Sequence, residues 1–113
     1  MKKENCSAFD YLEEAANISD YKNEIHDIQN DLHNLQNGND DNLYDANDIA
    51  SDIRFIAENI VSDFTQIGES VDKKEKQVLE LLSKANNDIL PGNMVDYTSN
   101  EFYQEVGNQE YSL

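Results

Sequence analysis

The sequence has little of several residue types, and each shortage excludes something. It contains no tryptophan, one proline, one cysteine and only 8 Lys and Arg among 113 residues. The single thiol, Cys6, cannot close an internal disulfide, which favours a reducing compartment, and we expect the cytoplasm of a bacterial host. No apolar run follows Lys2 and Lys3, so we expect no signal peptide. No stretch approaches the roughly 18 apolar residues that a membrane span needs.

Basic residues are too few to balance the acidic ones. The chain carries 24 Asp and Glu against 8 Lys and Arg, a formal net charge of −16 at pH 7. Between Asn23 and Asp72 there are 12 carboxylates and one base, Arg54. Binding to DNA or RNA requires Lys and Arg to replace the counterions of phosphates, and an anionic lipid surface repels a protein of this charge. We therefore expect a basic protein partner, with neither direct nucleic-acid binding nor membrane binding.

Sequence motifs of catalysis and metal binding are also missing. Nothing resembles a nucleophile elbow or a phosphate-binding loop. His26 and His33 are two helical turns apart, about 10 Å by helix rise, whereas metal ligands on a helix are more often four residues apart. The segment from Asn37 to Asn42 has oxygen ligands but lacks the closing Glu of a calcium-binding EF-hand loop. We predict a protein without enzymatic activity, metal or cofactor.

Apolar residues are present in a regular pattern, with steps of three and four that are typical of a coiled-coil seam. The first seam consists of Ile18, Tyr21, Ile25, Ile28, Leu32 and Leu35. The second consists of Ile49, Ile53, Ile56, Ile60, Phe64 and Ile67, with Phe55 and Val61 broadening the stripe. We predict a short N-terminal helix opened by Ser7, and long helices over about 18–37 and 41–87. Because Gly costs about 1 kcal/mol inside a helix, a kink or break at Gly68 is an open alternative.

The predicted fold is all-α, an antiparallel helical hairpin. Pro91 ends a helical domain over 1–90, and residues 91–113 form an acidic aromatic tail with only about one turn of helix. A hairpin alone leaves half of each apolar stripe in water. We therefore expect a homodimer that forms a four-helix bundle. The monomeric alternative is that the N-terminal helix and the tail pack back onto the hairpin.

Carboxylates follow both seams at steps of four, three and four. Neighbours at this spacing lie on one helix face about 5–6 Å apart, comparable with successive phosphates of a nucleic acid. The rows either form a plain solvated face or imitate a phosphate backbone, and the absence of Lys at i,i+4 positions favours the second interpretation. We predict that the partner binds these acids, and that two tail aromatics provide an apolar anchor: Asp20, Glu24, Asp27, Asp31, Asp41, Asp45, Asp48, Asp52, Asp63, Phe102 and Tyr103.

Two resemblances suggest functions. The segment from Tyr97 to Glu101 fits a Tyr-x-x-x-Asp/Glu motif after the predicted helices, and the topology resembles WXG100-type substrates of type VII secretion and the helical partners of LXG toxins. The turn has Leu35-Gln36-Asn37-Gly38 where that family has Trp-x-Gly. This resemblance implies a secretion partner or chaperone that binds through the apolar seam.

In charge and composition, the chain is similar to phage inhibitors of host nucleases, including DNA mimics and anti-CRISPR proteins. This resemblance implies a nuclease or effector complex as the partner. Our prediction is an acidic protein that occludes a basic nucleic-acid-binding site on its partner. The alternatives are the seam-binding secretion partner and an acidic structural coiled coil that only associates with itself.

Overall fold

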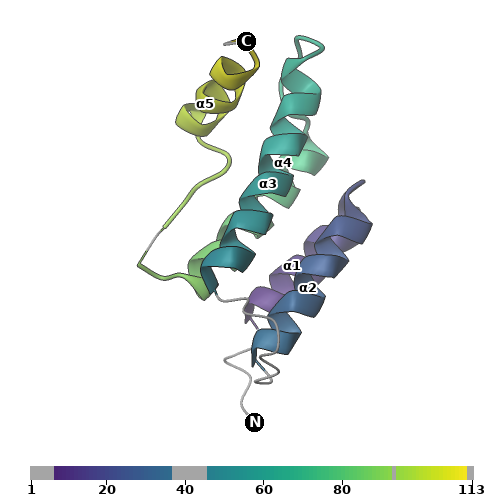
Figure 1. Cartoon of the computed structure of the whole chain (residues 1–113). Helices are drawn as coiled ribbons and strands as arrows, with labels where there is room; N and C mark the ends of the chain where they lie inside the picture. Colours follow the sequence, from purple (N-terminus) through teal and green to yellow (C-terminus); the bar gives the residue numbers. More distant parts are fainter. Residues whose placement is uncertain (1–6, 37–45, 93, 112–113) are drawn as a thin grey trace.

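The structure, a computed structural model, describes residues 7–36, 46–92 and 94–111. These residues form five helices and no strand, which confirms the all-α prediction (Figure 1). None of the described helices is both long and apolar enough to cross a membrane. The helices are α1 (Ser7–Ile18), α2 (Lys22–Gln36), α3 (Ala46–Thr65), α4 (Lys73–Ile89) and α5 (Asn100–Tyr111).

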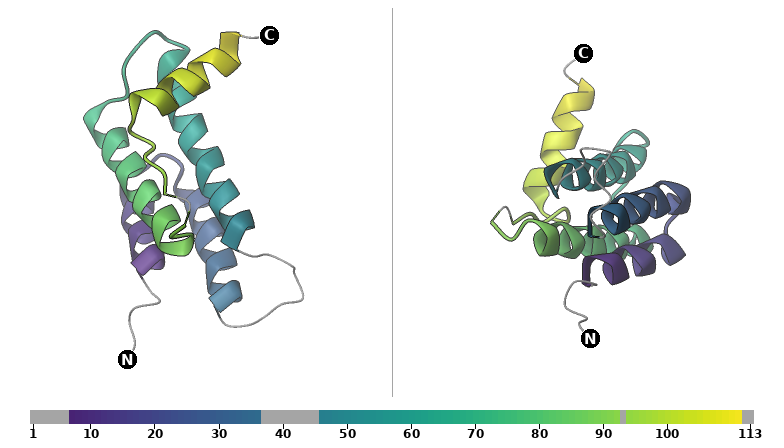
Figure 2. Two further views of the ribbon diagram at one scale, coloured as in Figure 1. Left: turned by 90° about the vertical axis from the view of Figure 1, so that its left-hand side faces the viewer. Right: turned by 60° about the horizontal axis from the view of Figure 1, so that its bottom comes forward.

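The first four helices lie side by side, and consecutive ones run in opposite directions (Figure 2). Helix α1 packs against α2 and α4, and α3 packs against the same two neighbours, so the four helices surround one core. Helix α5 packs on α3 at the end of the molecule remote from the N-terminus (Figures 1 and 2). The described arrangement is elongated, with extents of 45 × 27 × 25 Å.

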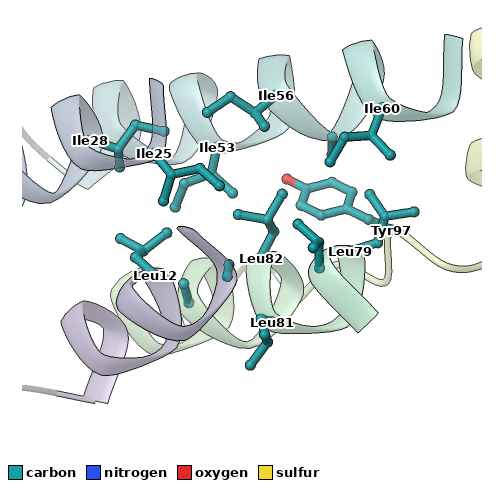
Figure 3. Packing of buried hydrophobic residues seen from close by; sticks show 14 of the residues in the cluster. Leu12, Ile25, Ile28, Ile53, Ile56, Ile60, Leu79, Leu81, Leu82 and Tyr97 are labelled. Atoms are coloured by element: carbon teal, nitrogen blue, oxygen red, sulfur yellow. The ribbon is translucent and has the colours of Figure 1, made fainter. Parts of the chain in front are cut away.

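The core takes apolar side chains from every helix. Leu12 of α1, Ile25 of α2, Ile53 of α3 and Leu82 of α4 are fully buried and point toward one another (Figure 3). Spacing of three or four residues places such side chains on one helix face, and burying each stabilises the fold by about 1.5–3 kcal/mol. The seam pattern of the sequence therefore becomes the interior of a single chain.

Much of the apolar stripe on α3 that we expected a second copy to cover is covered within the chain. Ile56 and Val61 are 3% and 0% exposed, and Phe64 is half-buried. This cover comes from the other helices, as in the monomeric alternative. Two residues of the broadened stripe remain largely in solvent: Phe55 on α3, which is 63% exposed, and Ile67 in the turn after α3, which is 66% exposed.

The predicted helix over 18–37 is wrong at its start. Ile18 ends α1, and the chain reverses through a turn before Lys22 begins α2. Ser19 Oγ accepts a hydrogen bond from the Tyr21 amide at 2.9 Å, a local bond that stabilises the turn. The seam spacing continues across this turn because Ile18, before the turn, and Tyr21, at its end, both pack against the core. Periodicity alone therefore could not reveal the reversal.

The single long helix over 41–87 is also wrong, and the break at Gly68 is confirmed. Gly68 has a φ of +74°, a left-handed conformation that costs an L side chain about 1–2 kcal/mol. The Glu69 amide donates to the Phe64 carbonyl at 2.9 Å and the Gly68 amide to the Thr65 carbonyl at 3.1 Å, the bonds of a Schellman motif. Asp72 then caps α4 by accepting the amide of Glu75 at 2.8 Å. Residues 41–45 lie outside the described part of the chain.

The expectation of an irregular C-terminal tail is wrong. Helix α5 has 12 residues, and its Phe102 and Val106 are buried in the same core cluster as Tyr97. The segment before α5 is held along α4, because Asn87 exchanges two hydrogen bonds with the Val95 backbone at 2.8 and 3.0 Å. Ser99 Oγ accepts the Phe102 amide at 3.1 Å, which caps the first turn of α5.

Candidate functional site

An open groove runs between α2 and α3, with acidic sides and an apolar floor. It has a volume of about 150 Å³. Buried Ile28 and Ile56 form its floor, and no Lys or Arg is among its lining residues. We call it the acidic groove, defined by Glu24, Asp27, Ile28, Asp31, Asp52, Phe55 and Ile56.

The acidic sides of this groove follow from helix geometry. Glu24, Asp27 and Asp31 are three and four residues apart on α2, beside the buried seam positions, so they stand at the edge of the solvated face. Asp52 stands at the corresponding edge of α3, one turn after Asp48. Because α2 and α3 lie antiparallel and in contact, Asp52 of the second predicted row faces the groove together with three acids of the first row.

Burial and neighbouring negative charges raise the pKa of two carboxyls that line the groove. Burial, followed by the charges of Asp52 and Asp27, raises the pKa of Asp31 above its ordinary value. Burial and the charge of Asp48 likewise raise the pKa of Asp52. The charge of Asp52 on α3 thus acts on Asp31 of α2 across the groove.

Phe55 places an aromatic ring on the side of the groove. Its 63% exposure is high for a large apolar side chain, and it adjoins the carboxylates of the groove. An aromatic face attracts cations, and neighbouring carboxylates add to that attraction. The site therefore favours a ligand that combines a positive charge with an apolar stem.

Two other predicted acids, Asp20 and Asp63, lie at the opposite end of α2 and α3. The Tyr21 hydroxyl donates a hydrogen bond to Asp63, and Lys74 Nζ lies 3.6 Å from Asp20 Oδ1. We call this the end cluster, which also contains Glu75 of α4. Unlike the acidic groove, it has a cation of its own in Lys74. Asp41 and Asp45 lie outside the described residues.

Glu75 is a charged residue that the sequence analysis did not single out. Only 5% of it is exposed, and its Oε1 has no hydrogen-bond partner among the described residues. Burial raises its pKa, and Lys74 Nζ, 3.8 Å from Oε2, acts in the opposite direction. The spacing of Asp72 and Glu75 is that of a capping box, a sequence signal that would have identified the start of α4.

The predicted tail anchor is wrong for Phe102, because only 5% of this side chain is exposed. Its ring lies 4.9 Å from that of Tyr97, centroid to centroid, and the guanidinium carbon of Arg54 lies 5.3 Å from its centroid. Tyr103 is half-buried against the core, and its buried hydroxyl has no hydrogen-bond partner in the described structure. Phe55, which we expected to be covered, is the aromatic residue that the acidic face presents to solvent.

Neither a metal-ligand arrangement nor a similar protein identifies what this surface binds. Among the described residues, no group of three or more His, Cys, Asp or Glu side chains has the arrangement needed to hold a metal ion. Comparison of the chain with protein-family models, with curated proteins and with solved structures finds no match. The function must therefore be inferred from the residues themselves.

Proposed function

We propose that the protein binds a basic nucleic-acid-binding protein through the face around the acidic groove and thereby occludes its nucleic-acid site. One observation carries this proposal: three carboxylates of α2 and Asp52 of α3 line one groove that no Lys or Arg lines. A cleft that binds phosphates presents Lys and Arg at its surface, and such a cleft is complementary to these carboxylates in charge.

The alternative of a plain solvated face explains the arrangement less well. A solvated helix face commonly mixes charges of both signs, which lowers repulsion. Here burial, and then repulsion by Asp52 across two helices, raises the pKa of Asp31, so this contact between like charges is unfavourable. A partner's cations would relieve it, because an opposite charge nearby favours the ionised carboxylate.

The hypothesis of a secretion partner needs the apolar seam at the surface. Ile53 and Ile56, the seam residues on which it depends most, are 0% and 3% exposed. No observation on the described residues favours this function over occlusion. The predicted homodimer stays a prediction, and sedimentation at several protein concentrations tests it. Like charges around Phe55 oppose a dimer that joins two acidic grooves directly.

Capture from nuclease-treated bacterial lysate tests the proposal. The immobilised protein should retain a nucleic-acid-binding protein at about 50 mM salt and release it at about 500 mM, because screening weakens exposed charge pairs. An added DNA or RNA fragment should compete with the immobilised protein for binding to the captured partner. A groove variant, Asp27→Asn with Asp31→Asn and Asp52→Asn, should lose the capture.

A matched control removes the same charge elsewhere. Asp10 and Glu14 of α1 and Glu80 of α4 are exposed and lie outside the acidic groove. The triple variant Asp10→Asn, Glu14→Gln and Glu80→Gln should capture the partner as the unchanged protein does. Equal loss in both triple variants, or a captured partner that ignores nucleic acid, would reject occlusion through this face.

A further inference from the structure

We infer that the acidic groove recognises arginine: a partner's guanidinium stacks on Phe55 while Asp31 and Asp52 accept its hydrogen bonds. This inference rests on the proposed function in using the same face, and it adds the chemistry of the occupant. It commits to an arginine-bearing protein segment, because the groove combines apolar and acidic surface within the space of one long side chain.

The lining of the groove indicates that its occupant has an apolar stem and a positively charged head. Ile28 and Ile56 form an apolar floor, and exposed Phe55 forms an apolar side. An inorganic cation would leave this surface in water, and an apolar ligand would desolvate the carboxylates without pairing them. Long basic side chains satisfy both requirements, since their methylene stems cover apolar surface while the charged head reaches polar groups.

The molecule contains a filled counterpart of this arrangement on the other side of α3. There the Arg54 guanidinium lies over the Phe102 ring, with Nε 2.8 Å from Glu58 and Nη2 2.7 Å from Glu105. We call this group the Arg54 cluster. An aromatic ring and carboxylates from two helices thus hold a guanidinium in this same fold. The acidic groove offers the same components, with Phe55 as the ring and carboxylates from α2 and α3.

Arginine fits these components better than lysine does. A guanidinium is planar, so it can stack on a ring while its edge donates two hydrogen bonds to carboxylates. An ammonium is a compact, strongly hydrated charge that gains less from an aromatic face. A stacked cation is worth about 0.5–1 kcal/mol at an exposed site, which corresponds to roughly a two- to fivefold difference in affinity.

Two fluorescent peptides of equal length, one with six Arg and one with six Lys separated by Gly, test this inference on the full chain by anisotropy. The unchanged protein should bind the Arg peptide about two- to fivefold more tightly than the Lys peptide. Phe55→Leu, which keeps an apolar side chain and removes the ring, should abolish the preference by weakening the Arg peptide more than the Lys peptide. Met94→Ala, at another exposed apolar residue, is the control and should keep it.

The outcomes separate this inference from the proposed function. If the preference for Arg survives Phe55→Leu, or if Met94→Ala removes it equally, the arginine groove is rejected while lysate capture and nucleic-acid competition still decide occlusion. If both peptides bind equally and only Asp31→Asn with Asp52→Asn weakens them, the surface is acidic without recognising arginine. If the preference depends on Phe55 but no nucleic-acid-binding protein is captured, the groove stands and occlusion fails. Circular dichroism confirms that each variant keeps its helices.

Discussion

The two sides of α3 combine similar groups with opposite results. On one side Arg54 binds Glu58 and Glu105 over the buried Phe102 ring. On the other, Phe55 stands beside carboxylates that no Lys or Arg of the groove lining neutralises. The difference is a single cation, since Arg54 is the one base between Asn23 and Asp72.

The presence or absence of this cation determines whether the carboxylates on each side of α3 are paired within the chain. Where it is present, two carboxylates and a phenyl ring fasten α5 to α3 and complete the core. Where it is absent, the carboxylates repel each other and the phenyl ring stays in water. A phenyl ring and carboxylates thus bind a cation of the chain itself on one side of α3 and face solvent on the other. The Arg54 cluster is therefore a reference against which the acidic groove can be compared.

Truncating the two phenyl rings should give the largest contrast. Phe102 is 5% exposed, so Phe102→Ala leaves a cavity and should lower the free energy of unfolding by about 3–5 kcal/mol. Phe55 is 63% exposed, and Phe55→Ala should change the free energy of unfolding by about 0.5 kcal/mol or less. Urea unfolding monitored by circular dichroism measures both. Equal losses would mean that Phe55 is buried in solution, as in a homodimer, and would remove the contrast between the two sides.

The helices themselves were largely predictable, but their ends were not. Steps of three and four in Ile25, Ile28 and Leu32 could only satisfy a helix, and α2 has this seam buried. The same steps continued through Ile18 and Tyr21, where the chain turns, because a periodic pattern carries no sign of a reversal between apolar residues. Caps carry that sign: Ser19, Asp72 and Ser99 each accept an amide near a helix start.

The composition of the site was predictable, whereas its assembly was not. Glu24, Asp27 and Asp31 could be assigned to one helix edge from spacing alone. That Asp52 would stand opposite them depends on which helices pack together, and sequence spacing within one helix does not contain this information. Phe102 was predicted as an apolar anchor for a partner, and packing of the tail onto the hairpin was left as an alternative. The sequence could not decide between them, because Tyr97, the aromatic partner of Phe102, precedes it in a segment without helical periodicity.

Removing the cation from the Arg54 cluster should have an intermediate effect. Arg54→Met keeps most of the stem over Phe102 but leaves Glu58 and Glu105 unpaired, and we expect a loss of about 1–2 kcal/mol in the free energy of unfolding. Arg54→Lys should lose less, because an ammonium keeps the charge but not the planar fork. The difference in stability between the unchanged protein and the Arg54→Met variant should shrink at about 1 M salt. A loss that is independent of salt would assign the contribution of Arg54 to packing alone.

Neutralising the acidic groove should have the smallest effect, with the opposite sign. Asp31→Asn with Asp52→Asn removes the repulsion across the groove and should raise the free energy of unfolding at pH 7 by a few tenths of a kcal/mol. The pKa of both carboxyls is raised in the folded chain, which therefore binds protons more tightly than the unfolded chain does. Lowering the pH toward the ordinary Asp value of about 3.9 relieves the repulsion, so the advantage of the double variant should vanish there.

Asp96→Asn should change stability in the opposite direction to the Asp31→Asn and Asp52→Asn double variant. The Thr98 hydroxyl at 2.6 Å and the Thr98 amide at 3.0 Å donate to Asp96 and lower its pKa, so its ionised form stabilises the folded chain. Its replacement should lower stability at pH 7, and that loss should shrink as the pH falls through the lowered folded pKa. Urea midpoints of the unchanged protein and both variants at pH 7 and at about pH 3, which is below the ordinary Asp pKa, measure the two trends. If neutralising Asp31 and Asp52 instead destabilised the protein at pH 7, these carboxylates would already be paired within the chain, and the acidic groove would have no unbalanced charge with which to attract a partner.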